Sequence, residues 1–325
     1  MESYIQLKKY LHLEKDSLRM FDRPHRGIYS IKDILKNEII LSIPHKYIVE
    51  YSKAKSILHL NDFLHNSNSV TATYLLLESK KKTSHYKAYI DTFPNNVDEY
   101  IYYYDKRRMQ QLKETSIIKG VSYNYKEHLK NMKEDSKTIY HSTCCPEIKK
   151  IYSTYKEFYD DFLRFRIMVC SRIFSYDRKN REELGMVPYA DLFNHSLHHA
   201  NTEWYFDDIT NSFIVRATQF IPKKKEILDS YGEKTNFELF LYYGFTLPHN
   251  PYSTLEFRYR TKEYILTAHS HPICIPSIEK YIQKILIHHE EKIKKKEIQD
   301  PNILTIYLDE IRIIKSILQK KCPKH

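Results

Sequence analysis

Two short segments in the second half of the chain constrain its fold more than any other feature. The first, GMVPYADLFNHS, runs from Gly185 to Ser196 and ends in an acid followed by Asn-His-Ser. The second, LDSYGEKTNFELFLYYGF, runs from Leu228 to Phe245 and combines a strand-like start, a glycine turn and an aromatic end. An average composition would give roughly twenty-three glycines, but this chain has five, and three lie in or beside these segments. Because glycine is needed where a backbone takes positive φ or approaches another group closely, we expect both segments to be shaped around something that lies against them.

Length and composition limit the class of protein. A chain of 325 residues with 42% hydrophobic and 14% aromatic residues can build one large or two modest domains. No run approaches the roughly 18 apolar residues of a membrane span, and MESYIQLKKYLHLEK lacks the apolar core of a signal peptide. The five cysteines are odd in number and show no C-x-x-C spacing, so we expect neither a disulfide framework nor a zinc site. The sequence thus predicts a reduced, intracellular protein, cytoplasmic or nuclear, and a monomer.

The formal charge of +11 arises from 52 basic and 41 acidic residues spread along the chain. Such a charge is compatible with nucleic acid, with an acidic protein partner, or with solubility alone. The sequence shows no RNP motif, zinc finger or compact basic recognition helix, so nucleic-acid binding is not expected. The neighbouring His195, His198 and His199 have no cysteine or acid at ligand spacing, so no metal is expected either.

Periodicity predicts an α+β fold. A helix over residues 4–14 precedes two strands within residues 26–44, which we expect to form a β-hairpin or meander. Helix periods then dominate from about residue 52 to 160, a helical insertion, and Glu157–Ser175 carries one apolar stripe with Phe158 and Phe162.

Strands return at Thr202–Phe206, Ser212–Ala217 and Glu226–Tyr231. Thr235 and Glu238 have capping-box spacing, and Gly244 is placed to end the helix that follows. A further strand and two helices close the chain, and the last helix has a stripe of Leu304, Leu308, Ile311, Ile314 and Leu318 that reads as core. Because no glycine-rich nucleotide fingerprint occurs, a doubly wound fold is disfavoured.

These motifs together resemble the SET-domain protein methyltransferases, in the subgroup of the Rubisco large-subunit and actin-histidine methyltransferases. The resemblance covers about residues 21–248 in consistent order and is carried most strongly by VPYADLFNHS followed by SYG-x-x-x-N-x-E-L-x-x-x-YGF. It implies small curved β-sheets with a pseudoknot-like crossing, a SET domain over residues 1–250 with the insertion at 52–160, and a short helical C-terminal region over 251–325. It also implies S-adenosylmethionine as cofactor and a protein substrate whose side chain enters a channel.

The resemblance assigns roles to individual positions. Tyr231 would be the catalytic tyrosine, and Asp191, Phe174 and Tyr243 would line the channel of the target side chain. The cofactor would be bound by Pro24, His25, Arg26, Gly27, Arg172, Asn194 and His195.

Two positions depart from the family's pattern. Relatives carry Gly-x-Gly in the opening loop, whereas this chain has His25-Arg26-Gly27 and keeps one glycine. Four residues beyond Arg172, a basic residue of the Rubisco enzyme is replaced by Tyr176. The first departure bears on cofactor affinity, and the second means that the Rubisco enzyme's substrate does not transfer.

The chemistry of methyl transfer agrees with these residue types. A lysine with a reference pKa near 10.4 must lose its proton before it attacks, and burial beside a positive sulfonium lowers that pKa without a strong base. The apolar Phe174 makes lysine the preferred acceptor, and the candidate substrates are an acidic protein or a histone. Protein-histidine methylation, and a SET fold that has lost catalysis and binds a partner, remain open alternatives.

Overall fold

The computed structural model describes the whole chain except residues 14–15, 22–25, 61–65, 122–124 and 323–325. The chain divides into two compact units. The first contains Met1–Asn95 and Met132–Gly232, and the second contains Asn96–Asn131 and Glu233–His325. In the described part of the chain, no helix combines the length and apolar character that a membrane crossing requires.

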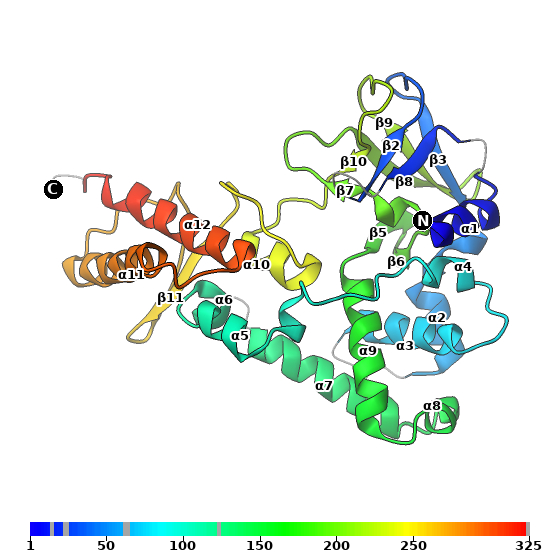
Figure 1. Cartoon of the computed structure of the whole chain (residues 1–325), viewed down its shortest axis with the longest axis horizontal. Helices are drawn as coiled ribbons and strands as arrows, with labels where there is room; N and C mark the ends of the chain where they lie inside the picture. The colour runs from blue at the N-terminus through cyan, green and yellow to red at the C-terminus, as the bar shows by residue number, and fades with distance from the viewer. Residues whose placement is uncertain (14–15, 22–25, 61–65, 122–124, 323–325) are drawn as a thin grey trace. The chain divides into compact units, whose positions relative to one another are not determined.

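The described residues of the first unit form four small sheets (Figure 1). Strands β1 (Leu18–Phe21) and β2 (Gly27–Ser30) pair antiparallel. A three-stranded antiparallel sheet has the order β3 (Ile39–Pro44), β9 (Ser212–Ala217), β8 (Thr202–Asp207). A second has the order β4 (Val49–Glu50), β6 (Arg181–Met186), β5 (Ile173–Arg178). The fourth pairs β7 (Asn194–His195) with β10 (Leu228–Asp229) in parallel.

Helices of the insertion pack beside these sheets in the same unit. They are α2 (Tyr51–Leu58), α3 (Ser67–Ser79), α4 (Lys87–Ile90), α8 (Pro146–Ile151) and α9 (Tyr155–Cys170), and α1 (Glu2–Tyr10) precedes them in the chain. Helix α9 begins with a capping box in which Thr154 and Glu157 bond each other's backbone amides. Its Phe158 and Phe162 are fully buried, and the helix packs against α3. The apolar stripe therefore forms the core that the sequence predicts.

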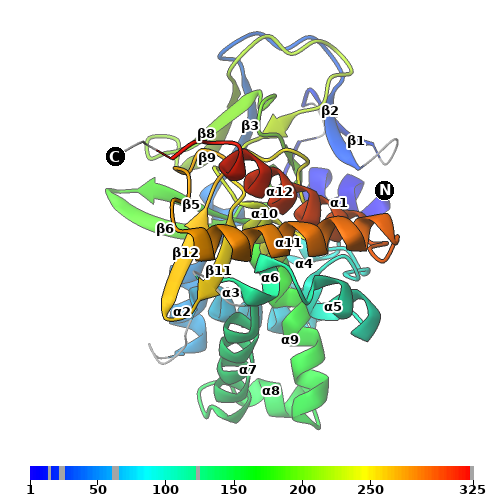
Figure 2. The same cartoon turned by 90° about the vertical axis from the view of Figure 1, so that its left-hand side faces the viewer.

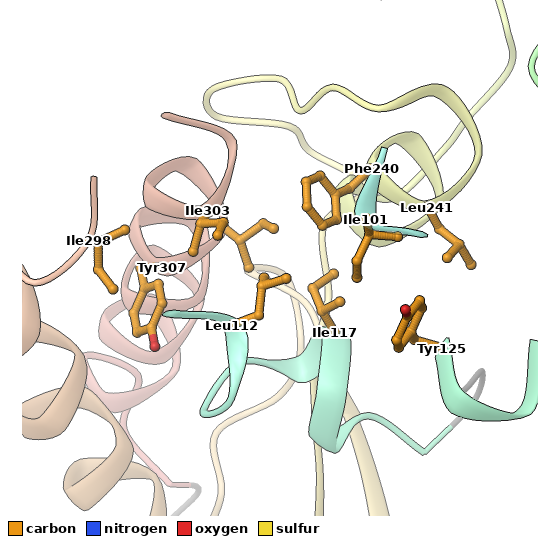
Figure 3. Packing of buried hydrophobic residues seen from close by; sticks show 10 residues of the cluster. Ile101, Leu112, Ile117, Tyr125, Phe240, Leu241, Ile298, Ile303 and Tyr307 are labelled. Atoms are coloured by element: carbon orange, nitrogen blue, oxygen red, sulfur yellow. The ribbon is translucent and has the colours of Figure 1, made fainter. Parts of the chain in front are cut away.

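The second unit is mostly helical. It contains α5 (Lys106–Leu112), α6 (Ser116–Lys119), α10 (Asn236–Glu238) and its π-helical continuation Leu239–Tyr243, the hairpin β11 (Leu255–Tyr259) and β12 (Lys262–Leu266), α11 (Pro276–Lys294) and α12 (Pro301–Leu318). Helix α7 (Tyr125–His141) contains the boundary between the units. Figure 2 shows α11 and α12 side by side. One core cluster joins Leu112, Phe240, Ile303 and Tyr307 (Figure 3), and a second packs α11 and α12 on β11.

Several predicted elements form as expected. Thr235 and Glu238 make the predicted capping box, and Gly244 ends the turn with φ of +77°. The expected hairpin within residues 26–44 is wrong, because β2 pairs with β1 and β3 pairs with β9. Strand periodicity identifies each strand but carries no information about its partner.

Two helix predictions also need correction. The helix expected over Glu157–Ser175 ends at Cys170, and Ile173 already begins strand β5. In α12 the predicted apolar stripe is shifted, since Leu308 is 50% exposed while Ile303 and Tyr307 are fully buried. The helix uses a wider buried face than a single stripe of aliphatic residues indicates.

The cysteines differ from expectation. Cys274 and Cys322 form a disulfide across a sequence separation of 48 residues, with Cα atoms 5.7 Å apart. It connects the segment before α11 to the end of α12. Neither an odd cysteine count nor the lack of a short spacing motif reveals a pair formed only by the packing of two helices.

We expect Cys322→Ser to lower the stability of the second unit only under oxidising conditions. Closing a loop of 48 residues lowers the entropy of the unfolded chain, which stabilises the folded state by about 4 kcal/mol in the chain-entropy treatment. Thermal unfolding with and without dithiothreitol measures the effect, with Cys144→Ser, at an exposed unpaired cysteine, as control. Equal loss of stability in both buffers would contradict the interpretation.

Candidate active site

The parallel pairing of β7 with β10 brings the two sequence segments together. Asn194 is opposite Leu228 and His195 is opposite Asp229 in this register. The Ser196 amide then donates to the Asp229 carbonyl over 2.9 Å, which extends the pairing by one residue. The Asn-His-Ser and Ser-Tyr-Gly segments therefore form one local structure, as the sequence predicts.

Tyr231 lies directly against His195. The two rings stack with centroids 5.0 Å apart, and the Tyr231 amide donates to His195 Nδ1 over 3.0 Å. The Tyr231 hydroxyl donates to the Phe193 carbonyl over 2.8 Å, which fixes the phenol ring. Burial lowers the pKa of His195, so the imidazole is neutral at pH 7 and its Nδ1 can accept this bond.

Asn194 connects these segments to the opening loop. Its Nδ2 donates to the Arg26 carbonyl and to Glu226 Oε1, each over 2.7 Å. Gly27 begins β2 and is buried in this contact, where a Cβ would collide with Glu226 Oε1 and lie 3.0 Å from Asn194 Nδ2. A side chain at this position would force the carboxylate at the end of the flexible Glu226 side chain to move. Pro24 and His25, predicted to act beside Arg26 and Gly27, lie outside the described residues.

Arg172 and Asp191 form a buried ion pair. Arg172 Nη1 lies 3.2 Å from Asp191 Oδ2, and the side chains are 7% and 0% exposed. The Tyr89 hydroxyl donates to the same oxygen over 2.6 Å. Burial raises the pKa of Asp191, while Arg172 and Tyr89 oppose the shift. The two residues predicted for separate cofactor and channel roles are therefore direct partners.

Phe174 lies in a cluster of aromatic rings. It stands on β5 opposite Gly185 of β6, and its ring meets Trp204 at 5.3 Å and Phe213 at 5.1 Å, both edge-to-face. Tyr176, where the Rubisco enzyme has a basic residue, is buried and donates to Glu50 Oε1 over 3.0 Å. The role of Phe174 in the channel of the target side chain stays a prediction.

Tyr243 belongs to the second unit. It ends the π-helical turn, is half-buried, and contacts Phe245 with ring centroids 6.2 Å apart. Its role in the channel wall stays a prediction.

Three polar residues contribute to the site without having been predicted from sequence. Glu226 accepts the Asn194 amide, Tyr89 donates to Asp191, and Asp229 lies buried in β10. Burial raises the pKa of Asp229 to about 6, although the Ser230 amide and the Trp204 and Thr202 side chains favour its charged form. Glu226 begins the predicted strand Glu226–Tyr231 and Asp229 lies three positions further along it. Acids inside an otherwise strand-like segment are the signal that could have pointed to them.

Comparison with known proteins identifies the family. The SET domain matches residues 25–232, which is more than half of the chain. This protein therefore belongs to the SET-domain family.

Similar proteins include a SET domain-containing protein and two named methyltransferases. SET domain-containing protein 4 of Artemia parthenogenetica is 22% identical over 265 residues, covering 79% of this chain and 64% of that protein. The chloroplastic Rubisco large subunit N-methyltransferase of Pisum sativum is 27% identical, covering 68% and 46%. Actin-histidine N-methyltransferase of Gallus gallus is 23% identical, covering 73% and 40%. The matched regions thus span less than two thirds of each of these relatives.

Solved structures confirm the fold class. The SET domain of LSMT bound to lysine and AdoHcy superposes with a TM-score of 0.71 at 16% identity, covering 98% of this chain and 90% of that one. Rubisco LSMT bound to AdoMet gives the same TM-score of 0.71 at 15% identity. The predicted α+β SET fold with small sheets and a helical insertion is confirmed.

At pH values above 6 we expect the Asp229→Asn variant to have a higher melting temperature than the wild-type protein. In the folded protein the Asp229 carboxyl keeps its proton up to about pH 6, whereas the ordinary pKa of an aspartate side chain is 3.8. As pH rises through this window the unfolded state releases the proton first, so stability falls, and that loss is complete above about pH 6. The asparagine variant escapes the loss, so its advantage over wild type should shrink as pH falls toward 4.

Thermal melts from pH 4 to 8 test this, with Asp177→Asn, at an exposed acid of β5, as the matched control. An advantage that does not change with pH would show that Asp229 is not the titrating group.

Proposed function

We propose that this protein is an S-adenosylmethionine-dependent protein methyltransferase and that its acceptor is a lysine side chain. One observation carries the proposal: the β7–β10 pairing sets Tyr231 against His195 and ties Asn194 to the Arg26–Gly27 loop. Membership of the SET-domain family supports the reaction class, and the relatives named above include methyltransferases.

The residues present fit this cofactor. Its sulfonium supplies an electrophilic methyl group when bound. Gly27 lets the Glu226 carboxylate and the Asn194 amide lie close to the backbone of the loop that would hold the cofactor. Asn194 and the stacked His195 and Tyr231 rings offer polar and aromatic surface, and the Glu226 carboxylate complements a cation. Pro24 and His25 precede Arg26 in the loop that would bind the cofactor. Arg172 would contribute by keeping Asp191 in place through their ion pair.

The chain's own side chains would prepare the acceptor amine. Phe174 and its aromatic neighbours exclude water, and this desolvation favours the neutral amine over the ammonium. Because the Tyr231 hydroxyl donates to the Phe193 carbonyl, its oxygen is held in one place and can accept a hydrogen bond from the amine. Orientation of this kind is a large part of catalysis in displacement reactions.

Histidine is the second candidate acceptor. Among the described residues, Asp191 Oδ1 is buried and has no hydrogen-bond partner. A carboxylate oxygen of this kind can accept an imidazole N–H and so orient a histidine. The aromatic surroundings of Phe174 favour the neutral amine of a lysine, which is why lysine is preferred.

We expect Tyr231→Phe to reduce methyl transfer by about 10²-fold, the scale for loss of one oriented polar group at a reacting centre. The ring and its stacking on His195 are retained, so folding should be unaffected. The assay incubates the purified protein with tritiated S-adenosylmethionine and cell extract, then identifies labelled amino acids after hydrolysis.

Tyr205→Phe, at a 40% exposed tyrosine of β8, is the matched control and should label normally. Labelled methyllysine supports the proposal, and labelled methylhistidine supports the second candidate. If the cofactor binds but no protein is labelled, neither lysine nor histidine methylation is supported. The protein is then a SET fold that binds a partner without catalysis.

We expect Gly27→Ala to weaken cofactor binding about 5- to 10-fold, equivalent to loss of one hydrogen bond of roughly 1 kcal/mol. The new Cβ displaces the Glu226 carboxylate and so removes its bond to Asn194. Calorimetric titration measures the affinity, and Glu226→Gln, which keeps an acceptor oxygen, should lose less. Unchanged affinity in Gly27→Ala would place the cofactor away from this loop.

A further inference from the structure

The first unit has a cavity of about 510 Å³ where helix α1 meets strand β1. Residues of α1 and β1 line it together with Tyr189, which precedes Asp191 by two positions. None of the residues placed in the candidate active site lines this cavity. Its volume lies within the roughly 300–1,000 Å³ range of small-molecule sites.

Most of the cavity wall is apolar. Tyr4 and Met20 are buried and lie at its inner side. Ile5 and Phe21, which both line the cavity, are 46% and 42% exposed, and these fractions are high for large apolar side chains. An apolar body bound here would cover this surface.

The charged groups at the cavity are all basic. Lys8 is neutralised by its ion pair with Asp16 and also donates to the Leu18 carbonyl over 2.8 Å. Lys9 and Arg19 are exposed and, within the described ranges, have no side-chain partner. No acidic residue is among those that line the cavity in the described part of the chain. The cavity therefore has a positive rim that complements one anionic group.

Tyr189 supplies a buried polar atom. The residue is 0% exposed, and its hydroxyl has no hydrogen-bond partner among the described residues. Lys8 Nζ lies 5.9 Å from the centre of its ring. The backbone at Tyr189 has φ of +74°, a strained conformation for a residue other than glycine. A buried hydroxyl without a partner is costly unless a ligand or water satisfies it.

One hydrogen bond joins the cavity to the opening loop, and a second joins that loop to Asn194. The Tyr4 hydroxyl accepts from Arg26 Nη1 over 3.1 Å, and the Arg26 carbonyl accepts from Asn194 over 2.7 Å. A ligand that packs on Tyr4 would thus bias the position of a residue proposed to hold the cofactor. By thermodynamic linkage, the cofactor would change the affinity of that ligand by the same factor.

We propose that this cavity binds a small amphipathic carboxylate, with an apolar body on Tyr4, Ile5 and Phe21 and its charge at Lys9 and Arg19, and that this ligand strengthens cofactor binding. The binding site stands on the cavity alone. The coupling rests on the proposed function, and only its experiment requires the cofactor.

The first experiment titrates the full chain with 4-phenylbutyrate, without cofactor, by calorimetry. We expect saturable binding that 4-phenylbutan-1-ol does not reproduce. The double variant Lys9→Ala/Arg19→Ala should weaken it at least 5-fold, and Ile5→Asp should abolish it. Lys36→Ala, which removes an exposed lysine that does not line the cavity, is the matched control and should bind normally.

The second experiment measures S-adenosylmethionine affinity with and without saturating 4-phenylbutyrate. We expect about 5-fold tighter cofactor binding with the carboxylate present. Tyr4→Phe keeps the ring but removes the bond to Arg26, so it should retain carboxylate binding and lose the enhancement.

Several results would overturn the proposal. Absence of carboxylate binding, or binding unchanged in the double variant and in Ile5→Asp, excludes the site. If the cavity binds the peptide acetyl-Asp-Phe-Asp-amide but not 4-phenylbutyrate, its ligand is a segment of a protein and the proposed small carboxylate is wrong. Enhancement that persists in Tyr4→Phe refutes the proposed route. If the carboxylate binds but S-adenosylmethionine does not, the proposed function fails while the cavity assignment stands.

Discussion

The two-residue parallel ladder between β7 and β10 is the contact on which the rest of the site depends. It places His195 beside Tyr231 although the two are far apart in the chain, and it leaves Asn194 facing the loop before β2. So short a ladder has little stability of its own, because each backbone hydrogen bond contributes only about 1 kcal/mol net. The ladder is therefore also stabilised by contacts around it. These are the stacked rings, the hydrogen bond from the Tyr231 amide to His195 Nδ1, and the Asn194 contacts.

A second buried element lies in the same unit, where Tyr89, Arg172 and Asp191 meet away from water. Removing one partner of such a pair leaves an uncompensated charge, which typically costs about 3–5 kcal/mol. The pair therefore resists substitution even if it touches no ligand. Tyr89 comes from the helical insertion, so that insertion supplies part of the structure around the proposed channel.

Much of the fold and the core of the site could be predicted from the sequence. Residues with local signatures were placed correctly: the capping box at Thr235, the stop at Gly244 and the strands of β8 and β9. Features that depend on distant partners were not, since the pairing of β3 with β9 and the Cys274–Cys322 disulfide leave no local pattern. Arg172 and Asp191 were identified singly, but their partnership depends on burial that only the packed structure reveals.

The single tryptophan of the chain has an unusual position. Trp204 meets Phe174 edge-to-face at 5.3 Å and stacks on Phe213 at 5.4 Å. Its indole is therefore in contact with the aromatic residue that we assign to the acceptor channel, and no other indole contributes to the emission. Fluorescence excited at wavelengths that tyrosine does not absorb therefore arises at Trp204 alone, so the unlabelled molecule carries a built-in optical reporter of the surroundings of Phe174.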